Sequence, residues 1–144
     1  MTLGDQLELK RFFAGGFLYN PKTQSVFLHK RDGNTRVNPN AWAFFGGLNE
    51  GTETPSECFK RELKEETGLD ASIEQIIPLC DYLNEELKTY RYVFYVESDV
   101  SKAQLVLGEG AGFDWVTLAA LDSYNLTEKT KRDLNYFKNI ISNG

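Results

Sequence analysis

The stretch "GGLNEGTETPSECFKRELKEETGLD", residues 46–70, decides how this sequence is interpreted. Its second half predicts a helix, because Thr54 can cap the first turn, Pro55 suits that turn and Glu57 completes a capping box. Gly68 is placed to end the helix in a left-handed conformation. The stretch therefore predicts a glycine turn that leads into a well-bounded helix.

Three glutamates of this helix, Glu62, Glu65 and Glu66, fall on one side of it by the 3.6-residue period. Like charges at such spacings repel by roughly a few tenths of a kcal/mol per pair. Hard cations such as Mg²⁺ prefer carboxylate oxygens, so the cluster indicates a metal site beside substrate phosphates. The alternative is a solvated helix in which Arg61 pairs with Glu57 and Glu65.

The wider spacing favours the metal site. From Gly47 the sequence reads Gly, five residues, Glu53, seven residues, Arg61-Glu62-Leu63, one residue, Glu65-Glu66, one residue, Gly68-Leu69. This matches the whole Nudix box, G-x5-E-x7-R-E-U-x-E-E-x-G-U, where U is a bulky aliphatic residue. With each defined residue at a background of about 5–7%, chance agreement is on the order of 10⁻⁹ per start position. The sequence therefore resembles the Nudix hydrolases.

The resemblance implies an α/β fold, an α/β/α sandwich around a mixed β-sheet, formed by a single domain over residues 1–144. Such enzymes cut a diphosphate linkage in a nucleoside diphosphate joined to another group. They use Mg²⁺, or Mn²⁺, and an attacking water. The cation neutralises phosphate oxygens and makes the water more acidic, and a carboxylate accepts its proton.

The resemblance also implies roles for individual residues. The metal-binding and catalytic carboxylates correspond to Glu62, Glu65 and Glu66. Arg61 orients one of them by a charge-assisted hydrogen bond, and Glu53 is an auxiliary carboxylate at the loop–helix junction. Gly46 or Gly47 offers a backbone carbonyl to the metal, where a side chain would block the approach. Gly68 completes the box.

In many family members a further ligand or base comes from a loop outside the box. The candidate here is Glu109 in "LGEGAGFDW", which precedes a predicted strand and is flanked by glycines. The alternative for Glu109 is a solvated turn glutamate. Glu97 and Asp99 are weaker candidates, because they lie at the far end of the preceding strand. Which carboxylate is the general base stays open.

Substrate-binding candidates are more widely spread. Possible phosphate contacts, with solvated surface as the alternative, are Arg11, Arg36 and Arg91. Aromatic residues that could stack on a base, with core packing as the alternative, are Trp42, Phe44, Tyr82, Tyr92 and Trp115. Asn125 precedes the last predicted helix, where MutT-type members read a purine with an asparagine. His29 is expected on a strand surface, without a role.

Missing features guide the choice of substrate. ADP-ribose-cleaving members usually carry a proline beyond the box, and this sequence has none after Pro78. The tyrosine of dinucleoside polyphosphate enzymes is also missing, since that region reads "NEELK" with Tyr90 slightly late. Elimination favours a MutT-like nucleoside triphosphate pyrophosphohydrolase that releases NMP and pyrophosphate. The alternatives are an ADP-ribose, dinucleoside polyphosphate or nucleotide-sugar hydrolase, and a sensor that binds nucleotides without cutting them.

Composition limits the partners. A net charge of −5 argues against a nucleic-acid polymer but allows a small nucleotide whose charge is offset locally. No apolar run approaches the roughly 20 residues that span a bilayer, and "MTLGDQLELK" lacks the apolar core of a signal peptide. We expect a cytoplasmic monomer or homodimer without a membrane partner. Free thiols at Cys58 and Cys80 are favoured over a disulfide.

The remaining patterns predict the order of elements. Strands are expected at residues 11–19, 25–31, 42–45, 72–83, 90–97 and 113–118, and a closing helix at 127–142. The core-facing residues of the two helices are expected to be Phe59, Leu63, Leu134, Phe137 and Ile141. This order suggests a mixed sheet with helices on its faces.

Overall fold

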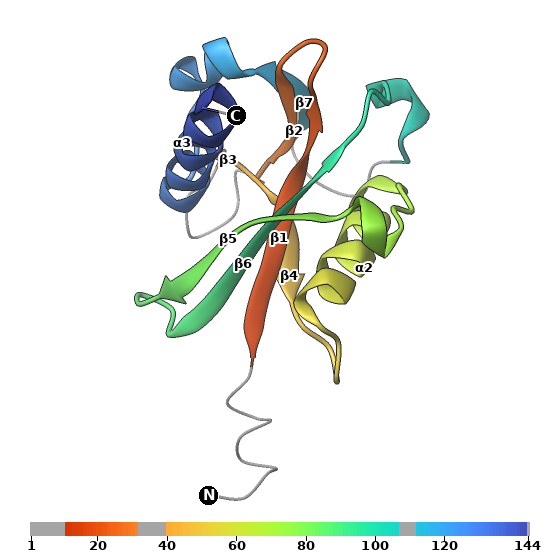
Figure 1. Ribbon diagram of the computed structural model, residues 1–144, viewed down its shortest axis with the longest axis vertical. Coiled ribbons are helices and arrows are strands. Elements are labelled where there is room, and N and C mark those ends of the chain that lie inside the picture. Colours follow the sequence, from red (N-terminus) through yellow and green to blue (C-terminus); the bar gives the residue numbers. More distant parts are fainter. Residues whose placement is uncertain (1–10, 32–39, 107–111, 144) are drawn as a thin grey trace, which may run out of the picture.

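The computed structural model describes residues 11–31, 40–106 and 112–143. Its strands are β1 (Phe12–Asn20), β2 (Ser25–Lys30), β3 (Trp42–Ala43), β4 (Phe45–Leu48), β5 (Ile77–Asn84), β6 (Thr89–Glu97) and β7 (Gly112–Thr117). Its helices are α2 (Pro55–Thr67) and α3 (Glu128–Asn143), and its short 3-10 turns are η1 (Ile73–Gln75), η2 (Lys102–Gln104) and η3 (Leu118–Ser123). The two helices cover opposite faces of one mixed sheet (Figure 1), which confirms the predicted sandwich.

Strand β1 lies at the centre of the sheet. One edge pairs in parallel with β6 from Phe12 to Tyr19. The other edge is shared, because its first half pairs with β4 and only its last three residues pair with β2. Strands β1 and β2 therefore diverge, and the segment of β3 and β4 fills the space between them. Phe44 is the residue at which this segment passes from β2 to β1.

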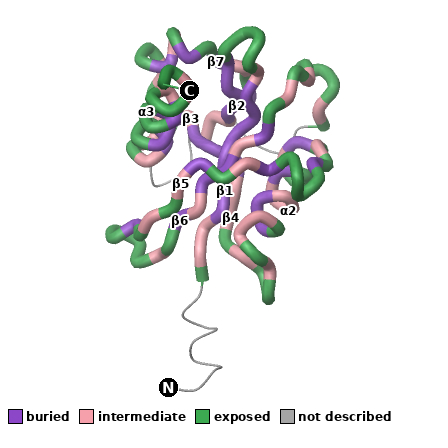
Figure 2. The backbone as a smooth tube through the Cα atoms, viewed as in Figure 1, coloured by how far each residue is buried: buried purple, intermediate pink, exposed green. Residues whose placement is uncertain are grey.

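Alternate residues of the strands build a core on each face of the sheet. Leu18 and Phe27 lie in the core beneath α2, whereas Phe17 lies in the core beneath α3. The side-chain period of a strand is two, so one strand serves both cores. Buried segments accordingly gather along the central strands (Figure 2).

Helix α2 begins and ends where the sequence predicts. The Thr54 hydroxyl accepts a hydrogen bond from the Glu57 amide, and the Glu57 carboxylate accepts one from the Thr54 amide. Gly68 closes the helix with a φ of 78°, in the left-handed region. Phe59 and Leu63 are fully buried. Both ends of the helix and its core face are confirmed.

Two strand predictions were wrong in part. Residues 72–83 do not form one strand, because Ser72 and Gln75 hydrogen-bond to each other and turn the chain through η1 before β5 begins. Residues 42–45 do not form one strand either. The chain changes partner at Phe44, so that β3 pairs with β2 and β4 continues along β1 to Leu48.

A buried polar network holds α3 against the sheet. The Arg91 guanidinium donates to the Asp133 carboxylate at 3.0 Å, and the Tyr82 hydroxyl donates to its other oxygen at 2.8 Å. Leu134 and Phe137 are buried beside this pair, as predicted, and Ile141 packs against the same core. The closing helix is thus located by a buried charge pair as well as by apolar packing.

Both cysteines are free thiols, which confirms that prediction. Burial raises the pKa of the Cys58 and Cys80 thiols to about 12. Neither described helix is long and apolar enough to cross a membrane.

Replacing Asp133 by Ala should lower the free energy of unfolding by about 3–5 kcal/mol, because it leaves the buried Arg91 charge without a partner. Urea unfolding measures the loss. Asp99→Ala is the matched control, since Asp99 forms an exposed ion pair with Lys22 at 3.9 Å, and it should cost about 1 kcal/mol or less. Equal losses in the two variants would contradict the importance of the buried pair.

Candidate active site

Gly46 and Gly47 lie within strand β4 rather than in a turn, and they meet the C-terminal half of α2. The Gly46 amide donates to the Glu66 carboxylate at 3.0 Å. Burial raises the pKa of Glu66 to about 8, and the neighbouring negative charge of Glu62 adds to the effect. A single backbone N–H is too weak a partner to reverse this shift. Glu66 is therefore a half-buried carboxylate whose charge is poorly compensated by the described residues.

Gly47 makes room for Glu62. A Cβ atom at Gly47 would clash with an oxygen of the Glu62 carboxylate, so only glycine leaves that carboxylate in its place. Burial also raises the pKa of Glu62, although the hydrogen bond from Arg61 opposes this. The spacing of Gly47 and Glu62 in the sequence thus becomes a close contact in the fold.

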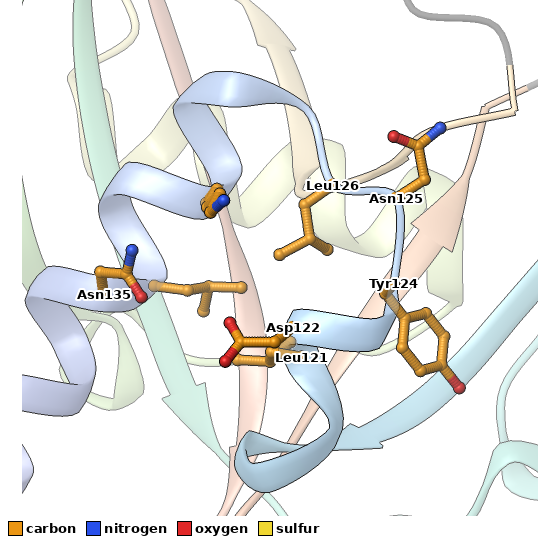
Figure 3. A pocket seen from close by; sticks show the side chains of 8 residues that line it. Leu121, Asp122, Tyr124, Asn125, Leu126 and Asn135 are labelled. Atoms are coloured by element: carbon orange, nitrogen blue, oxygen red, sulfur yellow. The ribbon is translucent and has the colours of Figure 1, made fainter.

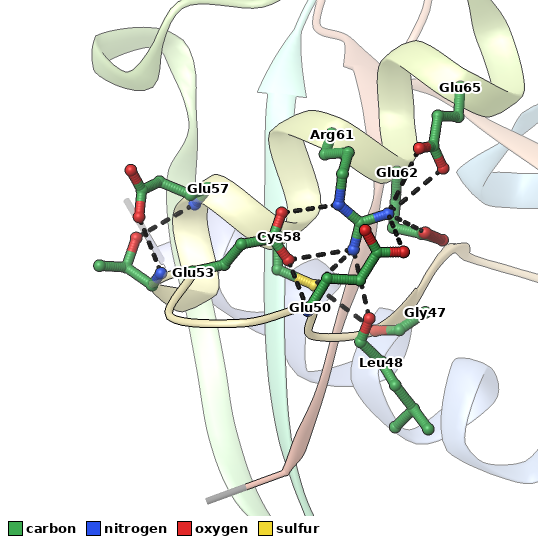
Figure 4. A network of polar contacts seen from close by, with 10 residues as sticks. Gly47, Leu48, Glu50, Glu53, Glu57, Cys58, Arg61, Glu62 and Glu65 are labelled. Atoms are coloured by element: carbon green, nitrogen blue, oxygen red, sulfur yellow. Dashed lines mark hydrogen bonds and ion pairs between the residues drawn. The ribbon is translucent and has the colours of Figure 1, made fainter. Parts of the chain in front are cut away.

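Arg61 ties the loop to the helix (Figure 4). Its guanidinium donates to both oxygens of Glu53, at 2.6 and 3.0 Å, and this lowers the pKa of Glu53. Another of its nitrogens donates to Glu62 at 2.8 Å and, more weakly, to Glu65 at 3.3 Å. It also reaches the Leu48 carbonyl at 3.3 Å. Arg61 therefore both anchors α2 and orients Glu62.

The box glutamates do not form a ready-made metal cage. Within residues 11–31, 40–106 and 112–143, no three carboxylate, thiol or imidazole groups are gathered closely enough for one. Glu62 and Glu65 contact Arg61, whereas Glu66 contacts the Gly46 amide. The available donors are nevertheless all hard oxygens, and the negative charge of Glu62 adds to the burial that raises the pKa of Glu66. Both features fit Mg²⁺ or Mn²⁺.

Glu66 lies at the wall of a cleft with two adjoining compartments. The first has a volume of about 430 Å³ and includes Glu66, Gly46, His29, Arg31, Ala43, Thr127, Lys129 and Thr130 in its lining. The second has a volume of about 470 Å³ and includes Leu48 and Thr89. Phe13, Asn84, Leu87 and Arg91 line both, so the compartments adjoin. The cleft opens where β1 and β2 diverge.

The structure brings some predicted substrate residues to this cleft. Phe44 lines it, and Arg91 lies 4.8 Å from the centre of the Phe13 ring while it binds Asp133. Arg11 is exposed and does not line either compartment. Arg36 and Glu109 lie outside the described residues, so their roles stay predictions.

The other aromatic candidates pack elsewhere. Trp42 meets the edge of the Tyr124 ring, and Trp115 packs on Phe27. Tyr82 binds Asp133, and Tyr92 packs against the core beneath α2. None of these four residues lines the cleft. For these four residues the structure supports a role in packing rather than in stacking on a base.

Asn125 is not brought together with Glu66. It lines a separate pocket of about 160 Å³ between η3 and α3 (Figure 3), which shares no lining residue with the cleft. Its carbonyl accepts a hydrogen bond from the Trp42 amide at 2.7 Å. In this arrangement Asn125 supports the chain before α3.

The prediction that His29 lies on a strand surface was wrong. Its ring packs against Phe45 and Phe113, hydrogen-bonds with the Phe44 carbonyl at 3.0 Å and lines the cleft. Burial lowers the pKa of His29. The alternation of β2, which places Phe27 and His29 on one face, was the signal that could have shown this. Asn84 was not predicted as a residue of the site, because the predicted strand ended at residue 83 and Asn84 was assigned to the polar connection that follows.

Comparison with known proteins agrees with this geometry. Residues 10–140 match the family model of the NUDIX domain. The nucleoside triphosphatase NudI of Enterobacter sp. (strain 638) is 30% identical over 105 residues, which cover 66% of this chain and 74% of that protein.

Solved structures show the same fold. A chain from a study of MutT from Aliivibrio salmonicida and Vibrio cholerae has a TM-score of 0.70 at 22% identity, over 87% of this chain and 97% of that one. A mutT/nudix family protein from Listeria innocua has a TM-score of 0.72 at 17% identity, over 92% and 94% of the two chains. With the family model covering most of its length, this chain belongs to the Nudix hydrolase family.

Proposed function

We propose that this Nudix hydrolase cuts nucleoside triphosphates and releases NMP and pyrophosphate. The observation that carries the proposal is the placement of Glu66, beside Glu62, at the wall of a cleft that also holds cationic side chains. The similarity to a protein named a nucleoside triphosphatase and to MutT structures supports this choice of substrate.

The proposed cofactor is Mg²⁺, with Mn²⁺ as the alternative. Glu62, Glu65 and Glu66 would hold it, together with the backbone carbonyl of Gly46. When bound, the cation would neutralise phosphate oxygens and make the attacking water more acidic. The box residues supply only hard oxygen donors, as this chemistry requires.

The residues of the chain have distinct tasks in this reaction. Arg61 keeps Glu62 oriented, while Lys129 offsets charge of the substrate in a protein whose net charge is −5. The water oxygen forms a bond to phosphorus, the bridging P–O bond breaks, and a carboxylate accepts the proton of the water. Glu62 and Glu65 are the candidates for this base among the described residues, and Glu109 is the candidate outside them.

A sensor that binds a nucleotide without cutting it is the second candidate. All the defined residues of the box are present, which favours catalysis over binding alone. A single domain over residues 1–144, a cytoplasmic location and a monomeric or homodimeric state remain predictions.

Glu62→Gln and Glu66→Gln should each lower kcat by at least about 100-fold with Mg²⁺, because several kcal/mol of charge stabilisation depend on these carboxylates. Turnover of a nucleoside triphosphate measures the loss, and EDTA should abolish wild-type activity. Glu74→Gln, on the distant η1 turn, is the control and should retain full activity. Wild-type rates in both active-site variants would refute the metal assignment.

The metal-free protein should lose stability as the pH rises from about 4.5 to 8. The folded state retains a proton on Glu66 up to about pH 8, whereas the unfolded chain releases it near 4.5. The stabilisation that comes from Glu66 is thus complete below this window and is lost above it. Glu66→Gln should reduce the loss of stability between pH 4.5 and 8. It should raise the melting temperature at pH 8 by on the order of a few degrees. Melting in EDTA at several pH values measures this, and an unchanged slope would contradict it.

A substrate panel tests the reaction. We expect Mg²⁺-dependent turnover of canonical or oxidised dNTPs, with NMP and pyrophosphate as products, in preference to ADP-ribose, dinucleoside polyphosphates and nucleotide sugars. Chromatography of the products identifies the bond that is cut. Fast turnover of ADP-ribose alone would overturn the substrate and keep the chemistry. No turnover, with nucleotide binding measured by calorimetry, would favour the sensor.

A further inference from the structure

Asn84 presents an unused hydrogen-bonding group to the cleft. It is the last residue of β5, its exposed fraction is 8%, and it lines both compartments. Its side-chain oxygen is buried, and no described residue donates a hydrogen bond to it. Buried polar atoms are almost always paired, so an unpaired one in a cleft points to a partner supplied by a ligand.

The surroundings of Asn84 indicate what kind of ligand this is. One compartment is charged, with Glu66, Lys129 and Arg31 in its lining. The other exposes mainly apolar surface, from Leu48 and from the shared residues Phe13 and Leu87, although Arg91 also lines it. A nucleotide has the same division, because its phosphates are charged and its base is flat, with a polar edge.

The orientation of a nucleotide in the cleft follows from this division. The phosphates belong beside Glu66, where the glutamates would hold the cation. The base then belongs in the apolar compartment, beside Phe13 and Leu87, with its polar edge turned toward Asn84. Arg91 cannot turn freely toward that edge, because its guanidinium is bound to Asp133.

We propose that the side-chain oxygen of Asn84 accepts a hydrogen bond from the exocyclic amino group at C6 of adenine or C4 of cytosine. The inference rests on the proposed function, in that the ligand is a nucleotide. Adenine and cytosine carry such a donor, whereas hypoxanthine and uracil carry a carbonyl oxygen at the same position. A carbonyl would leave two acceptors facing each other, and a site built around a hydrogen bond rejects an analogue that cannot make it. Asn84 is then a determinant of base specificity.

The experiment compares substrates that differ only in this group. Wild-type kcat/KM should favour dATP over dITP, or dCTP over dUTP, by about 10–100-fold, the value of one buried hydrogen bond. Asn84→Leu, of similar size, should reduce the preferred substrate to the rate of its partner. Asn84→Asp, which can only accept, should keep the preference. Asn135→Leu, an exposed change on α3, is the control and should behave as wild type.

Calorimetry separates this inference from the proposed function. Metal-free protein should bind AMP more tightly than IMP, or CMP more tightly than UMP, and Asn84→Leu should remove the difference. This preference without any hydrolysis would support the role of Asn84 and overturn the catalytic proposal. Hydrolysis at equal rates within both wild-type pairs would overturn the role of Asn84 and keep the catalytic proposal. The role of Asn84 would also be overturned if Asn125→Leu removed the base preference and Asn84→Leu did not.

Discussion

The contact between the Arg61 guanidinium and the Glu53 carboxylate is the constraint on which the active site depends. It joins the loop after β4 to the middle of α2 through two hydrogen bonds, at 2.6 and 3.0 Å. A two-pronged contact of this kind fixes direction as well as distance. A further nitrogen of the Arg61 guanidinium donates to Glu62 and holds its carboxylate over Gly47. Because Gly47 has no side chain, there is space for the carboxylate. Among the described residues, Glu66, one helical turn further on, has no cationic partner of its own.

The cleft results from a second constraint, the divergence of β1 and β2. A strand segment fills the gap by changing partner at Phe44, and this brings Gly46 of β4 into contact with Glu66. The other wall of the cleft depends on the buried pair of Arg91 and Asp133, which sets α3 against the sheet. The site is therefore assembled from the middle of α2, the start of α3 and the ends of strands that are distant in the sequence.

This assembly explains where the fold differs from what neighbouring residues in the sequence suggest. Asn125 and His29 were judged by their neighbours in the chain, but the fold places Asn125 in a separate pocket and turns His29 into the cleft. The local pattern of β5 likewise stopped one residue short of Asn84. Each outcome depends on which strands pair and where they separate, and neither follows from a short stretch of sequence.

The sequence by itself determined the helix, its caps and the box. These depend on contacts within about twenty residues, such as the Thr54–Glu57 capping box and the fit of Glu62 over Gly47, so their spacing in the chain is enough to specify them. Only the tertiary structure decided the shape and polarity of the cleft. Arg91, Asp133 and Asn84 come from separate elements, and their burial depends on long-range strand pairing and on the packing of α3. Burial determines whether a polar group is paired or left for a ligand, and burial is a property of the whole fold.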